Sequence, residues 1–211
     1  MAVAGSRVAC LIGAGVLAHT QLDALRIAMP DLAEVRVHDL RAERCAAFCA
    51  GRSAATGLDV RPAARAEEAV RGAAVVVPAT MAVAPTFAPE WLDDGATVVL
   101  VSSLDGPVEL HAVTDLLVVD DWEHESTHEG RYAQRLVAAG AIAAAGPGVA
   151  ELCDVVTGRH PGRSAPGDRV VVSPVGLALD DVTAAKHVLD RAKEAGLGTT
   201  LRLRSGPPVW E

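Results

Sequence analysis

The chain has 211 residues, half of them hydrophobic and 3% aromatic, and a formal net charge of −8 at pH 7. This length suits a single domain, 1–211, with an apolar core large enough to need no disulfide. The acidic balance argues against nucleic acid as a partner. No apolar stretch reaches the length that spans a membrane, and the N-terminus lacks the basic and long apolar regions of a signal peptide. We therefore expect a cytoplasmic protein with no membrane partner.

Short apolar runs and longer segments with helical spacing alternate along the whole chain. This alternation is typical of parallel crossover connections, and it predicts an α/β doubly wound, mostly parallel sheet with helices on both faces. We expect the last helix and the tail, 179–211, to pack back on the domain. The expected strands are 7–12, 34–39, 57–61, 73–78, 96–102, 115–119 and 169–172, and the expected helices are 16–29, 41–51, 64–71, 124–138, 147–157 and 179–195.

A glycine-rich turn, GAGVLA at 13–18, lies between the first expected strand and the first expected helix. Gly13 allows a tight turn, Gly15 leaves room for a diphosphate, and Ala18 lets the helix approach the strand. The helix N-terminus offers free N–H groups and partial positive charge to phosphates. The order of strand, glycine turn, helix, strand and acid predicts a dinucleotide-binding site. The residues assigned to it in this turn are Gly13, Gly15, Val16 and Leu17.

The segment Asp39-Leu40-Arg41, at the end of the second expected strand, bears on which dinucleotide binds. Asp39 follows Ala18 by 21 residues, the spacing at which an acid accepts hydrogen bonds from a ribose diol. Its charge favours the free 2′-hydroxyl of NAD and repels a 2′-phosphate. Arg41 could instead receive that phosphate, so NADP is the less favoured alternative. We assign Asp39, Leu40 and Arg41 to the cofactor site.

Further polar residues follow other expected strands, and the carboxyl ends of parallel strands meet at the edge where ligands bind. Thr80 and Ser102 could bond ribose or nicotinamide amide groups. Asp105 could act as a general acid or base if burial raises its pKa, although Asp-Gly-Pro is also a common turn sequence. The sequence therefore predicts Asp105 as the catalytic residue. The remaining cofactor residues assigned at this edge are Ala79, Thr80, Ser102, Ser103, Val175 and Gly176.

The segment His124-Glu125-Ser126-Thr127-His128 matches the HExxH pattern of zinc peptidases. Charged neighbours and the lack of a third ligand at helical spacing disfavour a metal site, so we assign none and keep a zinc hydrolase using His124 and His128 as a remote alternative. No GxSxG nucleophile turn occurs in the sequence. The only lysines are Lys186 and Lys193, so a mechanism that needs a lysine near the substrate must borrow it from elsewhere.

Five blocks of the sequence are informative together: LIGAGVLAHTQLDAL, EVRVHDLRAERCAAF, AAVVVPAT, EWLDDGATVVLVSS and SPVGLALDDVTAAKHVLDRAKEAGLGT. They resemble the ornithine cyclodeaminase/mu-crystallin family and occur in the family's order. This resemblance implies a Rossmann domain that binds NAD(P)(H) and chemistry at the α-carbon of an amino acid or imine. It also implies that Val175 and Gly176 belong to the turn beside the nicotinamide.

The chain departs from the family pattern in two places. Asp105 lies near the position of the family's catalytic aspartate but not at it, because Leu104 occupies the aligned position and the loop lacks a Gly-Lys pair. Family members also carry about a hundred residues before the glycine turn, the size of a substrate-binding and dimerisation domain. That region supplies a substrate-binding arginine and lysine. The chain therefore resembles the family's cofactor domain alone, and we expect a homodimer or a partner subunit to complete the active site.

These observations predict an NAD(H)-dependent oxidoreductase that acts on an amino acid, an imine or an amino-acid conjugate. Some segments are similar to the branch that makes 2,3-diaminopropionate by oxidising a glutamate conjugate. The alternative is a non-catalytic NAD-binding subunit or sensor that needs a partner.

Overall fold

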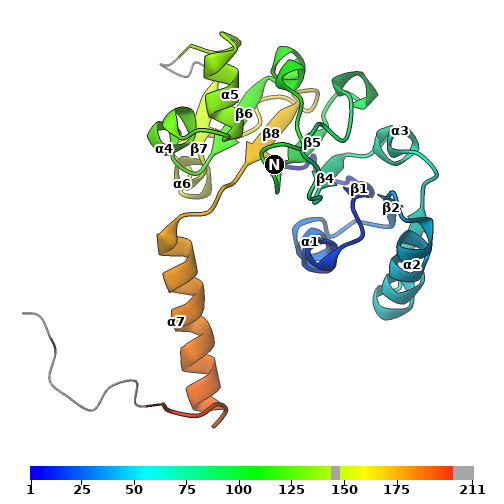
Figure 1. Ribbon diagram of the computed structural model, residues 1–211, viewed down its shortest axis with the longest axis vertical. Helices are drawn as coiled ribbons and strands as arrows, with labels where there is room; N and C mark the ends of the chain where they lie inside the picture. Colours follow the sequence, from blue (N-terminus) through cyan, green and yellow to red (C-terminus); the bar gives the residue numbers. More distant parts are fainter. Residues whose placement is uncertain (144–147, 202–211) are drawn as a thin grey trace, which may run out of the picture. The chain divides into compact units, whose positions relative to one another are not determined.

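A computed structural model of the chain describes residues 1–143 and 148–201. The first residue of the expected helix 147–157 and the last ten residues of the expected tail, 202–211, lie outside the described residues. The described residues form one parallel sheet of eight strands in the order β3-β2-β1-β4-β5-β8-β6-β7 (Figure 1). The predicted doubly wound α/β sheet is confirmed. Its strands are β1 (Val8–Ile12), β2 (Glu34–His38), β3 (Asp59–Pro62), β4 (Val75–Pro78), β5 (Thr97–Val99), β6 (Leu116–Val119), β7 (Val149–Glu151) and β8 (Val170–Ser173).

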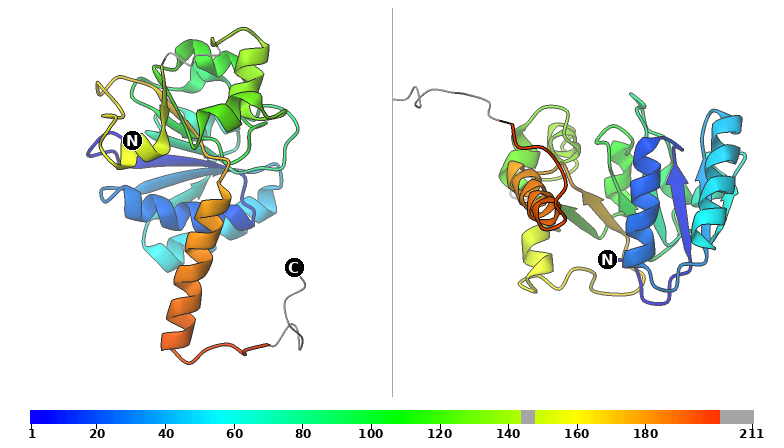
Figure 2. Two further views of the ribbon diagram at one scale, coloured as in Figure 1. Left: turned by 90° about the vertical axis from the view of Figure 1, so that its left-hand side faces the viewer. Right: turned by 90° about the horizontal axis from the view of Figure 1, so that it is seen from below.

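Helices connect the strands and cover both faces of the sheet (Figure 2). Across the residues that the structure covers, no helix is long and apolar enough to cross a membrane. The α-helices are α1 (Val16–Ala28), α2 (Ala42–Thr56), α3 (Ala66–Val70), α4 (Trp122–Thr127), α5 (Tyr132–Ala138), α6 (Leu152–Val156) and α7 (Ala178–Glu194), and two short 3₁₀ helices are η1 (Pro89–Trp91) and η2 (Val108–Val113).

Alternate residues of each strand enter different core layers, because successive side chains of a strand point to opposite faces. In β1, Ala9 and Leu11 pack with buried residues of α1 and α2. Cys10 and Ile12 pack on the other face, in a cluster that includes residues of α3 and α5. Both faces of β1 are thus buried, which holds the turn after Ile12 on a rigid support.

The structure corrects two predictions near the edge of the sheet. The expected helix 147–157 is instead the short strand β7 followed directly by α6. The expected helix 124–138 is two helices, α4 and α5, separated at Gly130, whose φ of +82° is a left-handed conformation that favours glycine. The strand β7 has only three residues, Val149–Glu151, and α6 follows it directly. A run this short shows no alternation of apolar and polar residues from which a strand could be predicted.

The chain divides into two compact units, Met1–Val175 and Gly176–Glu211. The sheet belongs to the first unit. The second unit contains α7, where the Asp180 carboxylate accepts a hydrogen bond from the Leu177 N–H at 3.1 Å, and the helix ends before Gly196, whose φ is +66°. The expected packing of 179–211 on the domain stays a prediction.

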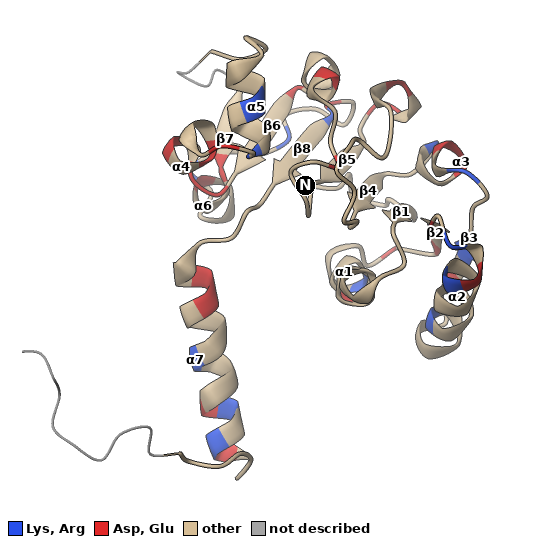
Figure 3. Cartoon of the chain, viewed as in Figure 1, with Lys and Arg blue, Asp and Glu red and all other residues tan. Residues whose placement is uncertain are grey.

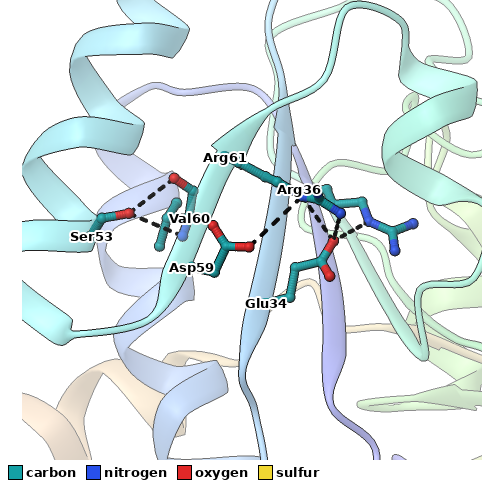
Figure 4. Close-up of polar contacts among 6 residues, drawn as sticks. All are labelled: Glu34, Arg36, Ser53, Asp59, Val60 and Arg61. Atoms are coloured by element: carbon teal, nitrogen blue, oxygen red, sulfur yellow. Dashed lines mark hydrogen bonds and ion pairs between the residues drawn. The ribbon is translucent and has the colours of Figure 1, made fainter.

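An ion-pair network lies where β2 and β3 begin (Figure 4). The Glu34 carboxylate accepts hydrogen bonds from the guanidinium groups of Arg36 and Arg61. Burial alone would raise the pKa of Glu34, but the hydrogen bonds and charges of the two arginines outweigh it and hold the pKa below its usual value. This network ties the starts of β2 and β3 together at the edge opposite the glycine turn.

Candidate functional site

The glycine turn after β1 brings three strand ends into contact. Gly13 has a φ of +100°, and its N–H donates to the carbonyl of His38, at the end of β2, at 2.7 Å. A Cβ at Gly13 would lie 2.7 Å from the carbonyl oxygen of Ala79, which follows β4. Both the backbone conformation and this close approach require glycine. The turn therefore sits against the ends of β2 and β4.

The N-terminus of α1 begins directly after this turn and faces open space. Gly15 is the N-cap residue, and a Cβ built on it would meet no atom within 4 Å. The first turn of α1 carries no acidic side chain, and Val16 and Leu17 are exposed. Free space, unobstructed N–H groups and the positive end of a helix dipole are what a diphosphate group needs. The turn therefore fits the diphosphate of a dinucleotide.

Asp39 is held just beyond the end of β2, with its side chain only 1% exposed. Its Oδ2 atom accepts a hydrogen bond from the Ala14 N–H at 2.8 Å, and its Oδ1 atom accepts one from the Arg41 N–H at 2.8 Å. The guanidinium group of Arg44, in the first turn of α2, pairs with Oδ2. Leu40, beside Asp39, is almost fully exposed. Asp39 thus shapes the glycine turn as well as lying in the predicted ribose position.

Thr80 and Asp105 join the loops that follow β4 and β5. The Asp105 carboxylate is fully buried and accepts hydrogen bonds from the Thr80 hydroxyl and, at 3.3 Å, from the Thr80 N–H. The Asp105 carbonyl accepts a further hydrogen bond from the Thr86 N–H at 3.1 Å. These contacts suit a residue that positions Thr80, and the catalytic role of Asp105 stays a prediction.

Ser102 and Ser103 form the loop between β5 and Asp105. The Ser102 carbonyl accepts a hydrogen bond from the Asp105 N–H at 3.3 Å. The Ser103 carbonyl accepts one from the Arg135 guanidinium at 2.6 Å, and the same nitrogen donates to the Gly106 carbonyl at 3.1 Å. Arg135, in α5, therefore holds this loop in place. Arg135 could not be found from the sequence, since its hydrogen bonds join residues about thirty positions apart and no local pattern marks them.

The end of β8 is held by a residue that follows β6. The Asp120 carboxylate accepts a hydrogen bond from the Val175 N–H at 2.7 Å. Gly176, the first residue of the second unit, has a φ of +87°, a left-handed conformation that favours glycine. The cofactor contacts predicted for Val175 and Gly176 stay predictions.

The HExxH segment begins inside α4 and ends at its C-cap residue, His128. The rings of His124 and His128 are stacked at a centroid distance of 4.0 Å. Within residues 1–143 and 148–201, no three His, Cys, Asp or Glu side chains gather to hold a metal ion, so the geometry does not supply the third ligand that the zinc alternative needs. Glu125, which follows His124 in the sequence, is buried. Its carboxylate oxygens make no hydrogen bond to the described residues. Burial raises the pKa of Glu125 to about 7.

A hollow of about 250 Å³ lies at the opposite edge of the sheet, where β4 and β5 begin. Backbone and small side chains form most of its wall, and the titratable groups in it are Asp93 and Asp94. These residues offer no nucleophile, general base or phosphate cradle. The edge with the glycine turn therefore remains the better candidate for function.

Comparison with known proteins places this geometry in a family. The model of the ornithine cyclodeaminase/mu-crystallin family matches residues 1–196. N-((2S)-2-amino-2-carboxyethyl)-L-glutamate dehydrogenase of Staphylococcus aureus is 29% identical over 194 residues, which are 92% of this chain and 57% of the relative. Alanine dehydrogenase of Archaeoglobus fulgidus is 30% identical over 203 residues, which are 90% of this chain and 58% of the relative. The chain thus spans little more than half the length of these relatives.

Solved structures agree with this placement. The Thermococcus litoralis Δ1-pyrroline-2-carboxylate reductase in complex with NADH and L-proline superposes with a TM-score of 0.87 at 27% identity, covering 95% of this chain and 62% of that one. An archaeal alanine dehydrogenase dimer with bound NAD gives a TM-score of 0.84 at 27% identity, covering 97% of this chain and 63% of that one. The resemblance found in the sequence is confirmed, and the chain belongs to the ornithine cyclodeaminase/mu-crystallin family.

Proposed function

We propose that the chain binds NAD(H) and serves an oxidoreductase that acts at the α-carbon of an amino acid, an imine or an amino-acid conjugate. The observation that carries this proposal is the junction of Gly13, Ala14 and Asp39, which places a small-residue turn, an open helix N-terminus and an acid side by side. Two relatives with known structures contain NADH or NAD. Their chemistry at amino acids and cyclic imines gives the substrate class.

Different residues at this edge of the sheet would bind different parts of the cofactor. The N-terminus of α1, opened by Gly15, would hold the diphosphate. Asp39 would accept a hydrogen bond from the adenosine ribose, and the exposed side chain of Leu40 would pack near the adenine. Thr80 and Ser102, which follow β4 and β5, would face the nicotinamide half.

When bound, the nicotinamide ring supplies hydride transfer to or from the substrate α-carbon. The chain supplies orientation: Arg135 fixes the loop of Ser103, and Asp105 fixes Thr80. The Thr80 hydroxyl donates a hydrogen bond to Asp105 and accepts one from the Ala82 N–H at 2.9 Å. Its remaining lone pair would accept a hydrogen bond from the nicotinamide amide. Asp105 is our proposed proton-handling residue at this edge, as the sequence predicts.

We propose that a second copy of the chain or a partner subunit completes the substrate site, since the two lysines of the sequence, Lys186 and Lys193, both lie in α7 of the second unit. The archaeal alanine dehydrogenase is a dimer, which supports this arrangement. All four cysteines are free thiols, as suits the reducing environment of the cytoplasm.

The test measures binding and turnover separately. NADH is titrated into the purified chain, and the absorbance of the reduced nicotinamide is then followed with NAD and L-alanine or L-proline, and with NADH and Δ1-pyrroline-2-carboxylate. The proposal predicts binding, and a substrate-dependent absorbance change that Asp105→Asn lowers at least about tenfold. Binding without turnover in any pair would indicate a binding subunit that needs a partner for turnover, and absence of binding would overturn the proposal.

A further inference from the structure

The helix α7, in the second unit, carries apolar side chains that stay exposed. Val182 is 66% exposed and Leu189 is 49% exposed, and across the residues that the structure describes no residue of α7 is buried. Leu179 and Val188 are exposed as well. Single exposed apolar residues are common, but several on one helix mark a surface that packs against another element. The helix therefore offers a docking face.

The apolar residues of α7 follow the spacing of a coiled-coil seam. Some of them alternate at steps of four and three residues, which places them in one line along the helix. Alanine at the two ends and the middle of this line allows a second helix to approach closely. The polar side chains of Thr183 and His187 lie on the opposite side of the helix. We call this line the α7 seam, and its residues are Ala178, Val182, Ala185, Leu189 and Ala192.

The α7 seam is symmetric about Ala185, which favours a second copy of the same helix as its partner. In an antiparallel pair centred on Ala185, that residue meets its counterpart, and Ala178 of one copy meets Ala192 of the other. Val182 then lies beside Leu189 of the other copy, so the larger side chains fill the space between the small ones. Such a pair has a two-fold axis and uses the same surface on both chains, as the commonest oligomers do.

The charges of α7 decide between the two directions in which two copies could pair. Its first turn is acidic, with Asp180 and Asp181, and its last turn is basic, with Arg191 and Lys193 (Figure 3). Arg191 contacts Glu194 at 3.6 Å, but an exposed pair of this kind contributes little. An antiparallel pair sets the acidic end of one helix against the basic end of the other, whereas a parallel pair sets like charges together. The charge pattern therefore favours the antiparallel pair.

A membrane surface is a poorer partner for the same face. Helices that lie on membranes are rich in Lys and Arg on their polar side. The helix α7 carries four acidic and three basic side chains. It therefore lacks the basic excess that would attract anionic lipid headgroups.

We propose that α7 is a dimerisation element, in which the α7 seams of two copies of the chain pair antiparallel. This inference rests on the proposed function for the role of the second copy, which completes the substrate site. A helix of this length spans about 25 Å, so the interface is small and the dimer should dissociate in the micromolar range. Packing of the same seam on the first unit of its own chain is the competing arrangement, and it predicts a monomer.

The first experiment measures the molar mass of the wild-type chain and of Leu189→Lys by sedimentation equilibrium, from about 1 μM to about 500 μM. We expect the wild-type mass to rise with concentration from that of one chain toward that of two. Leu189→Lys should raise the dissociation constant at least about thirtyfold, because it places a charge in the seam of both copies. Since Leu189 is exposed in the single chain, the substitution should leave the fold intact, which circular dichroism checks.

Ile27→Lys is the matched control for this measurement. Ile27 is also a large apolar residue in a long helix, α1 of the first unit, and it is 84% exposed. The substitution introduces the same charge and removes a similar apolar side chain, but it lies outside the seam. It should leave the dissociation constant within about twofold of the wild-type value.

A second experiment tests the direction of the pair by cross-linking. Cys153, the exposed native cysteine among the described residues, is first replaced by serine. In that background, Ala178→Cys and Ala192→Cys are oxidised separately and as an equimolar mixture, and non-reducing gels report the disulfide-linked dimer. The antiparallel pair brings position 178 of one copy to position 192 of the other, so the linked dimer should form in the mixture and be at least about tenfold scarcer in either variant alone.

Three results would overturn the inference. A wild-type chain that stays monomeric at about 500 μM would show that α7 packs on its own chain or on another protein. An equal dissociation constant for Leu189→Lys and the wild type would place the dimer contact on another surface. Cross-linking in the separate variants but not in the mixture would show a parallel pair. NADH titration distinguishes these failures from that of the proposed function: a monomer that binds NADH rejects the inference alone, and a seam-paired dimer that does not bind NADH rejects the proposed function alone.

Discussion

The two ends of β2 carry carboxylates that are used in different ways. Glu34, at the start of the strand, has a side chain that is 21% exposed and pairs with two arginine side chains (Figure 4). Asp39, just beyond the end, is 1% exposed and accepts two backbone N–H groups in addition to Arg44. The Glu34 carboxylate thus joins side chains, whereas the Asp39 carboxylate also binds backbone N–H groups.

This difference separates a stabilising contact from one that shapes a site. Side-chain ion pairs near the surface can rearrange at small cost, and each contributes about 1 kcal/mol or less. A buried carboxylate on backbone N–H groups fixes the path of the chain, and its loss leaves donors without acceptors. Asp39 therefore fixes the geometry of the glycine turn, whereas Glu34 secures the beginning of two strands.

The substitution with the largest expected effect on stability is Asp39→Ala. The change removes three hydrogen bonds and leaves the partly buried Arg44 charge without its partner, so we expect a loss of about 4 kcal/mol in the free energy of unfolding. Urea unfolding measures it. A loss below about 1 kcal/mol would show that Asp39 contributes no more than a surface pair.

Gly13→Ala tests the turn that Asp39 holds. The added Cβ would lie 2.7 Å from the Ala79 carbonyl oxygen, at a φ of +100°, so we expect a loss of about 3 kcal/mol. Gly51→Ala is the control, since Gly51 lies inside α2 with nothing within 4 Å of its Cβ position and should tolerate alanine or gain stability. Equal thermal stability for both variants would contradict the account of the turn.

Glu125 sharpens the comparison, because it is a buried carboxylate with neither arginine nor backbone donors on it. Burial raises its pKa to about 7; Arg131 opposes the shift, and Asp120 and Asp121 add to it. Because the folded chain holds this proton more tightly than the unfolded chain, the stability due to Glu125 is present at low pH. It is lost as pH rises from the ordinary carboxyl range through about 7.

Glu125→Gln should remove that loss. This rise in the pKa of Glu125 corresponds to at most about 3 kcal/mol. We expect the free energy of unfolding of the variant to exceed that of the wild type by about 2 kcal/mol at pH 8 and to be about equal to it at pH 5. Chemical unfolding across this pH range measures the difference. Glu123→Gln, at an exposed position of the same helix, should show no such pH dependence. A constant difference between Glu125→Gln and wild type at all pH values would refute the prediction.

The smallest effect is expected for Glu34→Gln. The two arginines hold the pKa of Glu34 below its usual value despite partial burial, so its stabilisation is present above the ordinary carboxyl pKa and is lost as pH falls through the lowered folded value. At neutral pH the loss should be about 1 kcal/mol. Asp59 lies near Glu34 and makes only a 4.0 Å contact with Arg61. Asp59→Asn should therefore lower the free energy of unfolding by less than Glu34→Gln does. A larger effect for Asp59→Asn would disprove the ranking.

Local patterns in the sequence predicted the parallel α/β sheet and the position of the glycine turn. Buried strands such as Val75–Pro78 stand out as apolar runs, and Gly13 and Gly15 mark a turn by residue type alone. The order of the strands in the sheet was not predicted from the sequence. The placement of β8 between β5 and β6 depends on packing between segments that are far apart in the sequence.

The sequence predicted which residues lie at the candidate site, but not which of them contact one another. Asp39 and Asp105 were selected because they follow strands, whereas their partners Ala14, Arg44 and Thr80 emerge only when loops from different strands meet. The same holds for the Arg135 contacts with the loop after β5. Pairings of this kind carry no periodic signal, so a structure is needed to find them.

The most direct measurement is an NADH titration by calorimetry of three proteins: wild type, Asp39→Ala and Glu34→Gln. The account predicts that wild type and Glu34→Gln bind NADH with similar affinity, and that Asp39→Ala binds at least about thirtyfold more weakly because both a ribose contact and the shape of the glycine turn are lost. Failure of the wild type to bind NADH, or equal affinity for wild type and Asp39→Ala, would contradict it.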